Sequence, residues 1–321
     1  MNYLLLVIGF VLLVKGADFF VEGSSKLAKI LKIPPIIIGL TIVAFGTSTP
    51  EAAVSISASI SGSAGISLGN VIGSNLINIS LILGLTAIIS PLFVQKKTII
   101  KEIPLALLGS FALLIMLLDV VLGKEQSISL SRIDGLLLLL FFAVFLYYII
   151  EVAIKSRNNQ KYFIEKDTQE KLSTLPNVLK LTIGLGGLVL GGWMVVKYGQ
   201  EIAFSLGMSE TLVGLTIVAI GTSLPELVTS ITAAIKKESE IALGNIIGSN
   251  IFNIMFVLGV SATINPIQTS SHILVDLVLM ILVTFLILIF ATTHHRKINR
   301  IEGSILFATY IAYLIFIIIR N

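Results

Sequence analysis

The 321-residue chain is 55% hydrophobic and only 12% charged, and its mean hydropathy is +1.01. A soluble domain averages about 25% charged residues, so this composition excludes a soluble protein and indicates an integral membrane protein surrounded by a lipid bilayer. Cysteine is absent, which excludes disulfides, thiolate metal sites and thiol nucleophiles. The net charge of +4 does not indicate a nucleic-acid partner, because Lys and Arg lie in short loops between apolar runs.

Ten apolar runs follow one another along the chain, and a helix needs about 20 such residues to cross a bilayer. The first run begins almost at Met1 and carries Lys15, Asp18 and Glu22, so we interpret it as a membrane span and not as a cleaved signal peptide. The sequence therefore predicts an all-α integral membrane protein with ten transmembrane helices. Their expected positions are 3–25, 36–60, 69–90, 99–120, 133–153, 177–203, 211–235, 243–264, 272–292 and 301–319.

The loops between these runs indicate how the chain is oriented. Every loop that follows an odd-numbered run contains several Lys or Arg residues, whereas loops 61–68, 204–210 and 265–271 contain none. Basic loops stay on the cytoplasmic side of a membrane. We therefore expect a multi-pass protein of the cell membrane with both termini extracellular and with the polar segment 154–176 in the cytoplasm.

The second half of the chain repeats the first at a constant offset of 175 residues, as from Thr47 to Thr222 and from Pro91 to Pro266. Five spans precede the restart, and an odd number means that the second copy enters the membrane from the opposite face. The sequence thus predicts two inverted-topology repeats of five helices. Residues 1–153 form the first repeat, 154–176 the linker and 177–321 the second repeat.

The best-matched stretch reads GLTIVAFGTSTPE at 39–51 and GLTIVAIGTSLPE at 214–226. Each copy places a carboxylate, Glu51 or Glu226, in an apolar run, where an ionisable group is costly and marks a functional site. Pro50 has no N–H to donate to the Gly46 carbonyl, so we expect this helix to kink or unwind. Carbonyls near the kink, including that of Ala44, are then expected to lack helical partners and to line a cavity.

These residues supply a cluster of oxygen atoms. On a helix, Thr47 and Ser48 can share a face with Glu51. Hard cations such as Ca2+ take about six to eight oxygen ligands, and two carboxylates neutralise one divalent ion, which offsets most of the cost of burying them. The second copy supplies the same set, from Ala219, Thr222, Ser223 and Glu226.

A second pair of motifs, GNVIGSNLIN at 69–78 and GNIIGSNIFN at 244–253, adds polar groups four residues apart, Ser74 with Asn78 and Ser249 with Asn253. An Asn side chain can offer its amide oxygen to a cation. We interpret the glycines of these motifs, Gly69, Gly73, Gly244 and Gly248, as helix-packing positions. We expect Asp18 and Glu22 to pair with Lys15 and Lys26 outside the site, and we assign no role to Asp276.

With these motifs the chain resembles the cation/calcium antiporter superfamily, and in particular prokaryotic sodium/calcium exchangers. The resemblance rests on GTSTPE at 46–51, GTSLPE at 221–226 and the two asparagine motifs, and with the ten-span layout it covers essentially the whole chain. It implies Glu51 and Glu226 as central ligands of Ca2+ and Na+ at mid-membrane. It further implies the carbonyls of Thr47 and Thr222 as Ca2+ ligands, Asn78 and Asn253 as lining residues, and Ser48, Ser223, Ala44, Ala219, Ser74 and Ser249 as flanking Na+ ligands.

The resemblance also implies an antiporter that carries Ca2+ and Na+ by alternating access, with helices 1 and 6 sliding across the other eight. We expect it to need no cofactor and to work as a monomer. Asn253, where some family members carry Asp, favours plain Na+/Ca2+ exchange over K+ co-transport. The alternative is a proton-coupled Ca2+ antiporter, whose typical GN-x-x-E pattern is missing. An intramembrane hydrolase lacks an activating His or Lys in either motif, and a passive channel fits an inverted repeat less well.

Overall fold

The computed structural model describes residues 2–62, 64–118, 128–160, 174–206, 219–269, 272–293 and 295–320. In the first half the elements are α1 (Asn2–Leu31), α2 (Pro35–Ile38), η1 (Gly39–Val43), α3 (Ala44–Thr47), α4 (Thr49–Ile60), α5 (Ala64–Leu76), η2 (Ile77–Ile82), α6 (Leu83–Ile89), β1 (Leu92–Phe93), η3 (Thr98–Glu102), α7 (Ile103–Leu117), β2 (Ile128–Leu130) and α9 (Arg132–Gln160), where η marks a π-helical turn. In the second half they are α10 (Thr174–Ser205), α12 (Ala219–Thr222), α13 (Leu224–Ile235), α14 (Ser239–Ile251), η5 (Phe252–Val257), α15 (Leu258–Ile264), β3 (Ile267–Thr269), α16 (His272–Thr292), β4 (Lys297–Ile298) and α17 (Arg300–Arg320).

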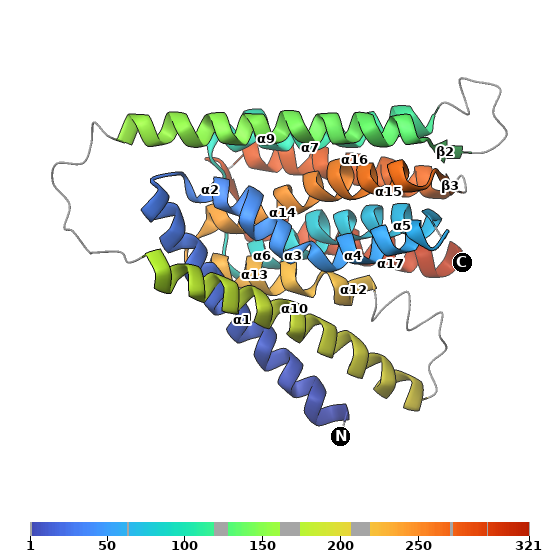
Figure 1. Ribbon diagram of the computed structural model, residues 1–321, viewed down its shortest axis with the longest axis horizontal. Helices are drawn as coiled ribbons and strands as arrows, with labels where there is room; N and C mark the ends of the chain where they lie inside the picture. The colour runs from blue at the N-terminus through green and yellow to red at the C-terminus, as the bar shows by residue number, and fades with distance from the viewer. Residues whose placement is uncertain are drawn as a thin grey trace.

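The helices form an elongated bundle, which α1 and α10 cross together on a diagonal (Figure 1). Within the described ranges, eight helical spans are long and apolar enough to cross a membrane, and a ninth consists of two segments, Pro35–Thr47 and Thr49–Ile60, bent by 51°. The all-α membrane class is thereby confirmed. The seventh predicted span, 211–235, is described only from residue 219 onward. The predicted total of ten transmembrane helices therefore stays a prediction.

The repeat seen in the sequence recurs in the structure. Every boundary from α3 to α6 reappears 175 residues later in α12 to α15, including the π-helical turns η2 and η5. Two short antiparallel sheets, which the sequence did not predict, also match: Leu92 of β1 pairs with Ile298, and Ile267 of β3 pairs with Leu130. Pro91 and Pro266 precede these strands and cannot continue a helix, so the chain is extended there.

The predicted break in the second span is present at Ser48, which separates α3 from α4 with φ −81° and ψ 9°. The matching break is at Ser223, between α12 and α13. The expectation that the Ala44 carbonyl lacks a helical partner is wrong, because it accepts the Ser48 N–H at 2.9 Å. Proline removes a donor only from the carbonyl four residues before it, and for Pro50 that residue is Gly46.

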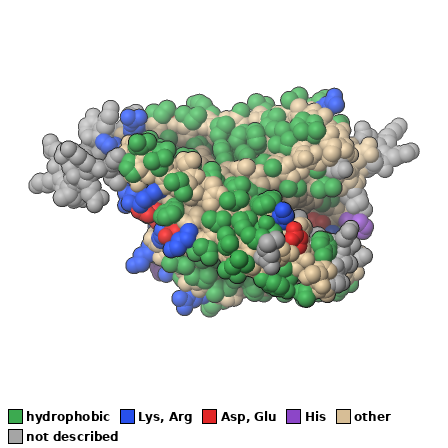
Figure 2. All heavy atoms as spheres, turned by 60° about the horizontal axis from the view of Figure 1, so that its bottom comes forward, with side chains coloured by type: hydrophobic (Ala, Val, Ile, Leu, Met, Phe, Trp, Pro, Cys, Tyr) green, Lys and Arg blue, Asp and Glu red, His purple; other side chains and the backbone are tan. Residues whose placement is uncertain are grey.

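Hydrophobic side chains cover most of the face shown in Figure 2, and Lys and Arg gather toward one end of it. Glu22 pairs with Lys26 and with Lys180 of α10, both at 2.7 Å. The predicted pair of Glu22 with Lys26 is confirmed. Asp18 instead pairs with Lys236 of the loop between α13 and α14 at 2.5 Å, so its expected pairing with Lys15 is wrong.

Glycines set the closest helix contacts. A Cβ atom at Gly16 of α1 would lie 2.7 Å from the Leu188 nitrogen of α10, and one at Gly184 would lie 2.5 Å from the Phe20 nitrogen. Gly244 of α14 packs on Gly39 in the same way, which confirms its predicted packing role. The segment that corresponds to Gly39 in the second repeat, around residue 214, lies outside the described residues, so the predicted packing role of Gly69 and Gly73 stays a prediction.

Candidate cation site

The two broken helices bring the predicted site residues together in the middle of the bundle, between α3, α4, α5 and η2 of the first half and α12, α13, α14 and η5 of the second (Figure 1). All of these side chains are buried except that of Thr222, which is partly exposed, and that of Ala219, which lies outside the description. The buried ones are those of Ala44, Thr47, Ser48, Glu51, Ser74, Asn78, Ser223, Glu226, Ser249 and Asn253.

Each carboxylate is held by a serine of the other half. Ser48 Oγ donates to Glu226 Oε1 at 2.8 Å, and Ser223 Oγ donates to Glu51 Oε1 at 3.0 Å. The serines stand at the helix breaks, where the change of backbone direction places their hydroxyls across the interface. The second oxygen of each carboxylate, Oε2, is buried and has no hydrogen-bond partner among the described residues.

The charge of the two carboxylates is not compensated by protein cations. Glu51 and Glu226 are 1% and 0% exposed, and none of the ion pairs in the described ranges involves either one. The two groups also repel each other electrostatically. A buried, unpaired charge is strongly unfavourable, so this arrangement requires a bound cation or proton.

Two asparagines that the sequence analysis did not assign brace the carboxylate helices. Asn70 Nδ2 donates to the Glu51 carbonyl at 3.3 Å and to Ser55 Oγ at 2.9 Å. Asn245 makes the equivalent contacts with the Glu226 helix at the same distances. Both belong to the GN pair of the repeated asparagine motif, which was the available signal. They tie each carboxylate helix to the helix that follows it.

The motif asparagines Asn78 and Asn253 present free amide oxygens. Asn78 Nδ2 donates to Asn250 Oδ1 and Asn253 Nδ2 donates to Asn75 Oδ1, both at 3.1 Å. The Oδ1 atoms of Asn78 and Asn253 are buried and have no partner within the described part of the chain. These two oxygen atoms therefore have no protein partner in the described structure, and their role as cation ligands stays a prediction.

The remaining hydroxyls differ in how they are engaged. Thr47 Oγ1 donates to Asn245 Oδ1 at 2.9 Å, so its proton is engaged within the protein. Ser74 Oγ donates to the Val71 carbonyl at 3.2 Å. The matching hydroxyl of Ser249 is buried and has no partner among the described residues.

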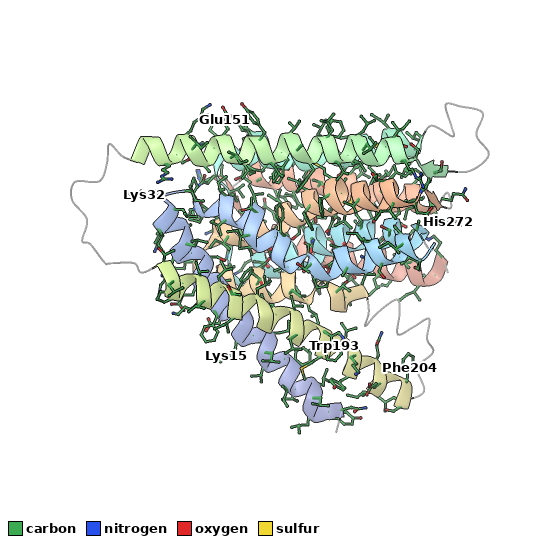
Figure 3. All side chains as sticks on the ribbon, in the orientation of Figure 1. Lys15, Lys32, Glu151, Trp193, Phe204 and His272 are labelled. Atoms are coloured by element: carbon green, nitrogen blue, oxygen red, sulfur yellow. The ribbon has the colours of Figure 1, made fainter. Side chains whose placement is uncertain are left out.

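Other charged residues lie outside this cluster. Asp276, which the sequence left without a role, forms a two-pronged ion pair with Arg320 at 2.9 and 3.0 Å. Glu151 lies on the outer side of α9, and Lys32 and His272 lie toward opposite ends of the bundle (Figure 3).

A family model described as "Sodium/calcium exchanger protein" matches residues 1–151 and 177–319. The chain belongs to this family. The exchanger is 41% identical over 269 residues to the inner membrane protein YrbG of Escherichia coli, covering 82% of this chain and 79% of that one. It is 33% identical over 344 residues to the sodium/calcium exchanger MaX1 of Methanosarcina acetivorans, covering 98% and 97%.

The fold of the exchanger also matches solved structures. One is the sodium-calcium exchanger NCX_Mj soaked with 2.5 mM Na+ and 0.1 mM Ca2+, with a TM-score of 0.83, 33% identity and coverage of 97% of this chain and 96% of that one. Together with the apolar helices, these matches show a multi-pass membrane transporter of the cation/calcium exchanger type.

Proposed function

We propose that this exchanger carries Na+ and Ca2+ in opposite directions through a single site built on Glu51 and Glu226. One observation carries the proposal: each carboxylate has one oxygen fixed by a serine of the other half and one buried oxygen without a partner. Buried polar atoms nearly always have partners. Two carboxylate oxygens and two amide oxygens, all buried and without partners, are ligands of the kind that a hard cation takes.

The proposed ligands combine atoms that have no partner in the described structure with atoms that the family resemblance implies. The central set is the two carboxylates with the amide oxygens of Asn78 and Asn253. The carbonyls of Thr47 and Thr222 complete the Ca2+ site. Flanking Na+ positions use the remaining predicted atoms, which are the hydroxyls of Ser48, Ser223, Ser74 and Ser249 and the carbonyls of Ala44 and Ala219. Within the protein the Ala44 carbonyl accepts the Ser48 N–H at 2.9 Å and Thr47 Oγ1 at 3.3 Å, so a Na+ bound there takes the place of the longer contact.

Charge explains why the two fluxes are coupled. One Ca2+ or two Na+ neutralise two carboxylates, and a third Na+ adds one net positive charge. An empty site keeps an uncompensated buried charge, which disfavours the transition between outward- and inward-facing states without cargo. If three Na+ exchange for one Ca2+, one net charge crosses the membrane per cycle, worth about 2.3 kcal/mol per 100 mV.

The moving part is the pair α1 and α10, which we propose slides across the rest of the bundle. The backbone contacts at Gly16 and Gly184 make the two helices a single unit. We further propose that the exchanger works as a monomer of two inverted repeats, 1–153 and 177–321. The positive-inside pattern supports extracellular termini and a cytoplasmic 154–176 linker.

The test is Ca2+ uptake into liposomes that contain the purified exchanger. We expect an outward Na+ gradient to drive Ca2+ uptake, and an ionophore that dissipates this gradient to abolish it. A pH gradient imposed without Na+ should drive no uptake. Uptake that follows the pH gradient and ignores Na+ would establish the proton-coupled alternative instead.

A further inference from the structure

Two more asparagines, Asn75 and Asn250, lie at the contact between the two halves of the exchanger. Asn75 Nδ2 donates to the Asn250 carbonyl at 3.2 Å, and Asn250 Nδ2 donates to the Asn75 carbonyl at 3.4 Å. The residues are 175 positions apart, so they are repeat partners and the contact is reciprocal. Both are buried, at 0% and 4% exposure. We call this contact the amide bridge.

Both residues lie just before a π-helical turn. Asn75 precedes η2, and Asn250 precedes η5. In each half of the exchanger the amide of the opposite asparagine donates to the backbone carbonyl at this point.

Each member of the bridge also contacts one candidate ligand. Asn250 Oδ1 accepts from Asn78 Nδ2, and Asn75 Oδ1 accepts from Asn253 Nδ2. The ligand amides therefore use their nitrogen atoms on the bridge. Their oxygen atoms are the ones that remain without partners in the described structure.

The orientation of all four amides is fixed by the two backbone carbonyls, because a carbonyl only accepts hydrogen bonds. Asn250 has to turn its Nδ2 toward the Asn75 carbonyl, so its Oδ1 faces Asn78. Asn78 then has to present its Nδ2 to that oxygen, and its own Oδ1 faces away from the bridge. A flipped Asn78 would bring two amide oxygens together and leave a buried N–H group without an acceptor, which is unfavourable.

We propose that Asn75 and Asn250 are positioning residues, whose bridge keeps the amide oxygens of Asn78 and Asn253 turned toward the transported cations. The inference rests on the proposed function of the site. A cation is attracted by an amide oxygen and repelled by an amide N–H donor, so a ligand that is free to flip binds it less well. Residues that orient metal ligands typically change affinity by about 10- to 100-fold when they are replaced.

A double-mutant cycle tests the proposal, with Ca2+ binding to the full-length purified exchanger as the measurement. The variants are Asn250→Leu, Asn78→Leu and both together. We expect Asn250→Leu to raise the half-saturating Ca2+ concentration by about 10- to 100-fold and the double variant to bind no more weakly than Asn78→Leu alone. Losses that multiply in the double variant would overturn the proposal, because Asn250 would then act independently of Asn78.

The equivalent cycle in the other half, with Asn75→Leu and Asn253→Leu, keeps the test decisive if Asn250→Leu does not fold. Asn75 accepts from Asn253 as Asn250 accepts from Asn78, so we expect the double variant to bind Ca2+ no more weakly than Asn253→Leu alone, and losses that multiply would overturn the positioning role. The matched control is Ser80→Ala on η2, whose buried hydroxyl donates to the Leu76 carbonyl. It should leave Ca2+ binding unchanged, and an equal loss there would also overturn the proposal.

The Ca2+-binding measurement separates the proposed function of the site from the positioning role of Asn75 and Asn250. Absence of Ca2+ binding in the wild type would refute the proposed function. Normal Ca2+ binding in the wild type together with unchanged binding in Asn250→Leu would refute the positioning role alone.

Discussion

At the scale of single residues, the site is defined by atoms that are buried and unpaired. Glu51 and Glu226 each keep one such oxygen, while their other oxygen is fixed by a serine that stands at a helix break of the opposite half. Fixed ligands lose little conformational freedom when a cation binds. The serines therefore hold the carboxylates in a fixed orientation before a cation binds.

Neutralising either carboxylate should stop transport. Glu51→Gln and Glu226→Gln preserve shape but remove one of two buried charges and introduce an N–H donor where the cation lies. We expect Na+-driven Ca2+ uptake to fall to the level of protein-free liposomes in each variant. Glu151→Gln is the matched control, because Glu151 lies outside the site and pairs with Lys155. Wild-type uptake in either site variant would show that the cations bind elsewhere.

The two motif serines should not be equivalent, although they occupy matching repeat positions. Ser249 Oγ has no partner in the described structure, whereas Ser74 Oγ already donates to Val71 and accepts from Asn253 Nδ2 at 3.3 Å. We expect Ser249→Ala to raise the half-saturating Na+ concentration about fivefold, the loss of about one hydrogen-bond-sized contact. Ser74→Ala should have a smaller effect, and a larger one would contradict this assignment.

At the scale of elements, the sequence was sufficient to predict where a helix breaks, but not which side chains of distant elements contact each other. The break before Pro50 follows from the missing N–H of one residue, so the sequence was sufficient to place it. The π-helical turns η2 and η5 have no comparable signature. The amide bridge joins Asn75 to Asn250, which no local pattern connects. Asn70 and Asn245 stand in the repeated motif, but the sequence does not show that each contacts the carboxylate helix 19 residues earlier.

The close packing of α1 against α10 depends on glycine residues. A Cβ atom at Gly16 would meet the α10 backbone at 2.7 to 2.9 Å, and overpacking of this kind costs about 1–3 kcal/mol. We expect Gly16→Ala to lower the thermal unfolding midpoint in detergent and to slow transport. Gly186→Ala on α10 is the control, since a Cβ there meets nothing within 4 Å. An unchanged midpoint and rate for Gly16→Ala would argue against a tightly packed moving unit.

At the scale of the whole molecule, the repeat explains how two carboxylates come to share one site. A 175-residue offset is visible in the sequence, and the structure reproduces it in the boundaries of five successive elements. The sequence could therefore predict the class of fold and the residues that converge. It could not predict which oxygen of each residue would remain free, because that depends on hydrogen bonds between the two halves.

The central claim is that Na+ and Ca2+ compete for the same buried oxygens. The most direct measurement is Ca2+ binding to the purified exchanger in detergent at increasing Na+ concentrations. We expect Na+ to raise the half-saturating Ca2+ concentration more steeply than in proportion to its own concentration, and a variant with both Glu51→Gln and Glu226→Gln to bind no Ca2+. Ca2+ binding that is insensitive to Na+, or that persists in the double variant, would contradict the claim.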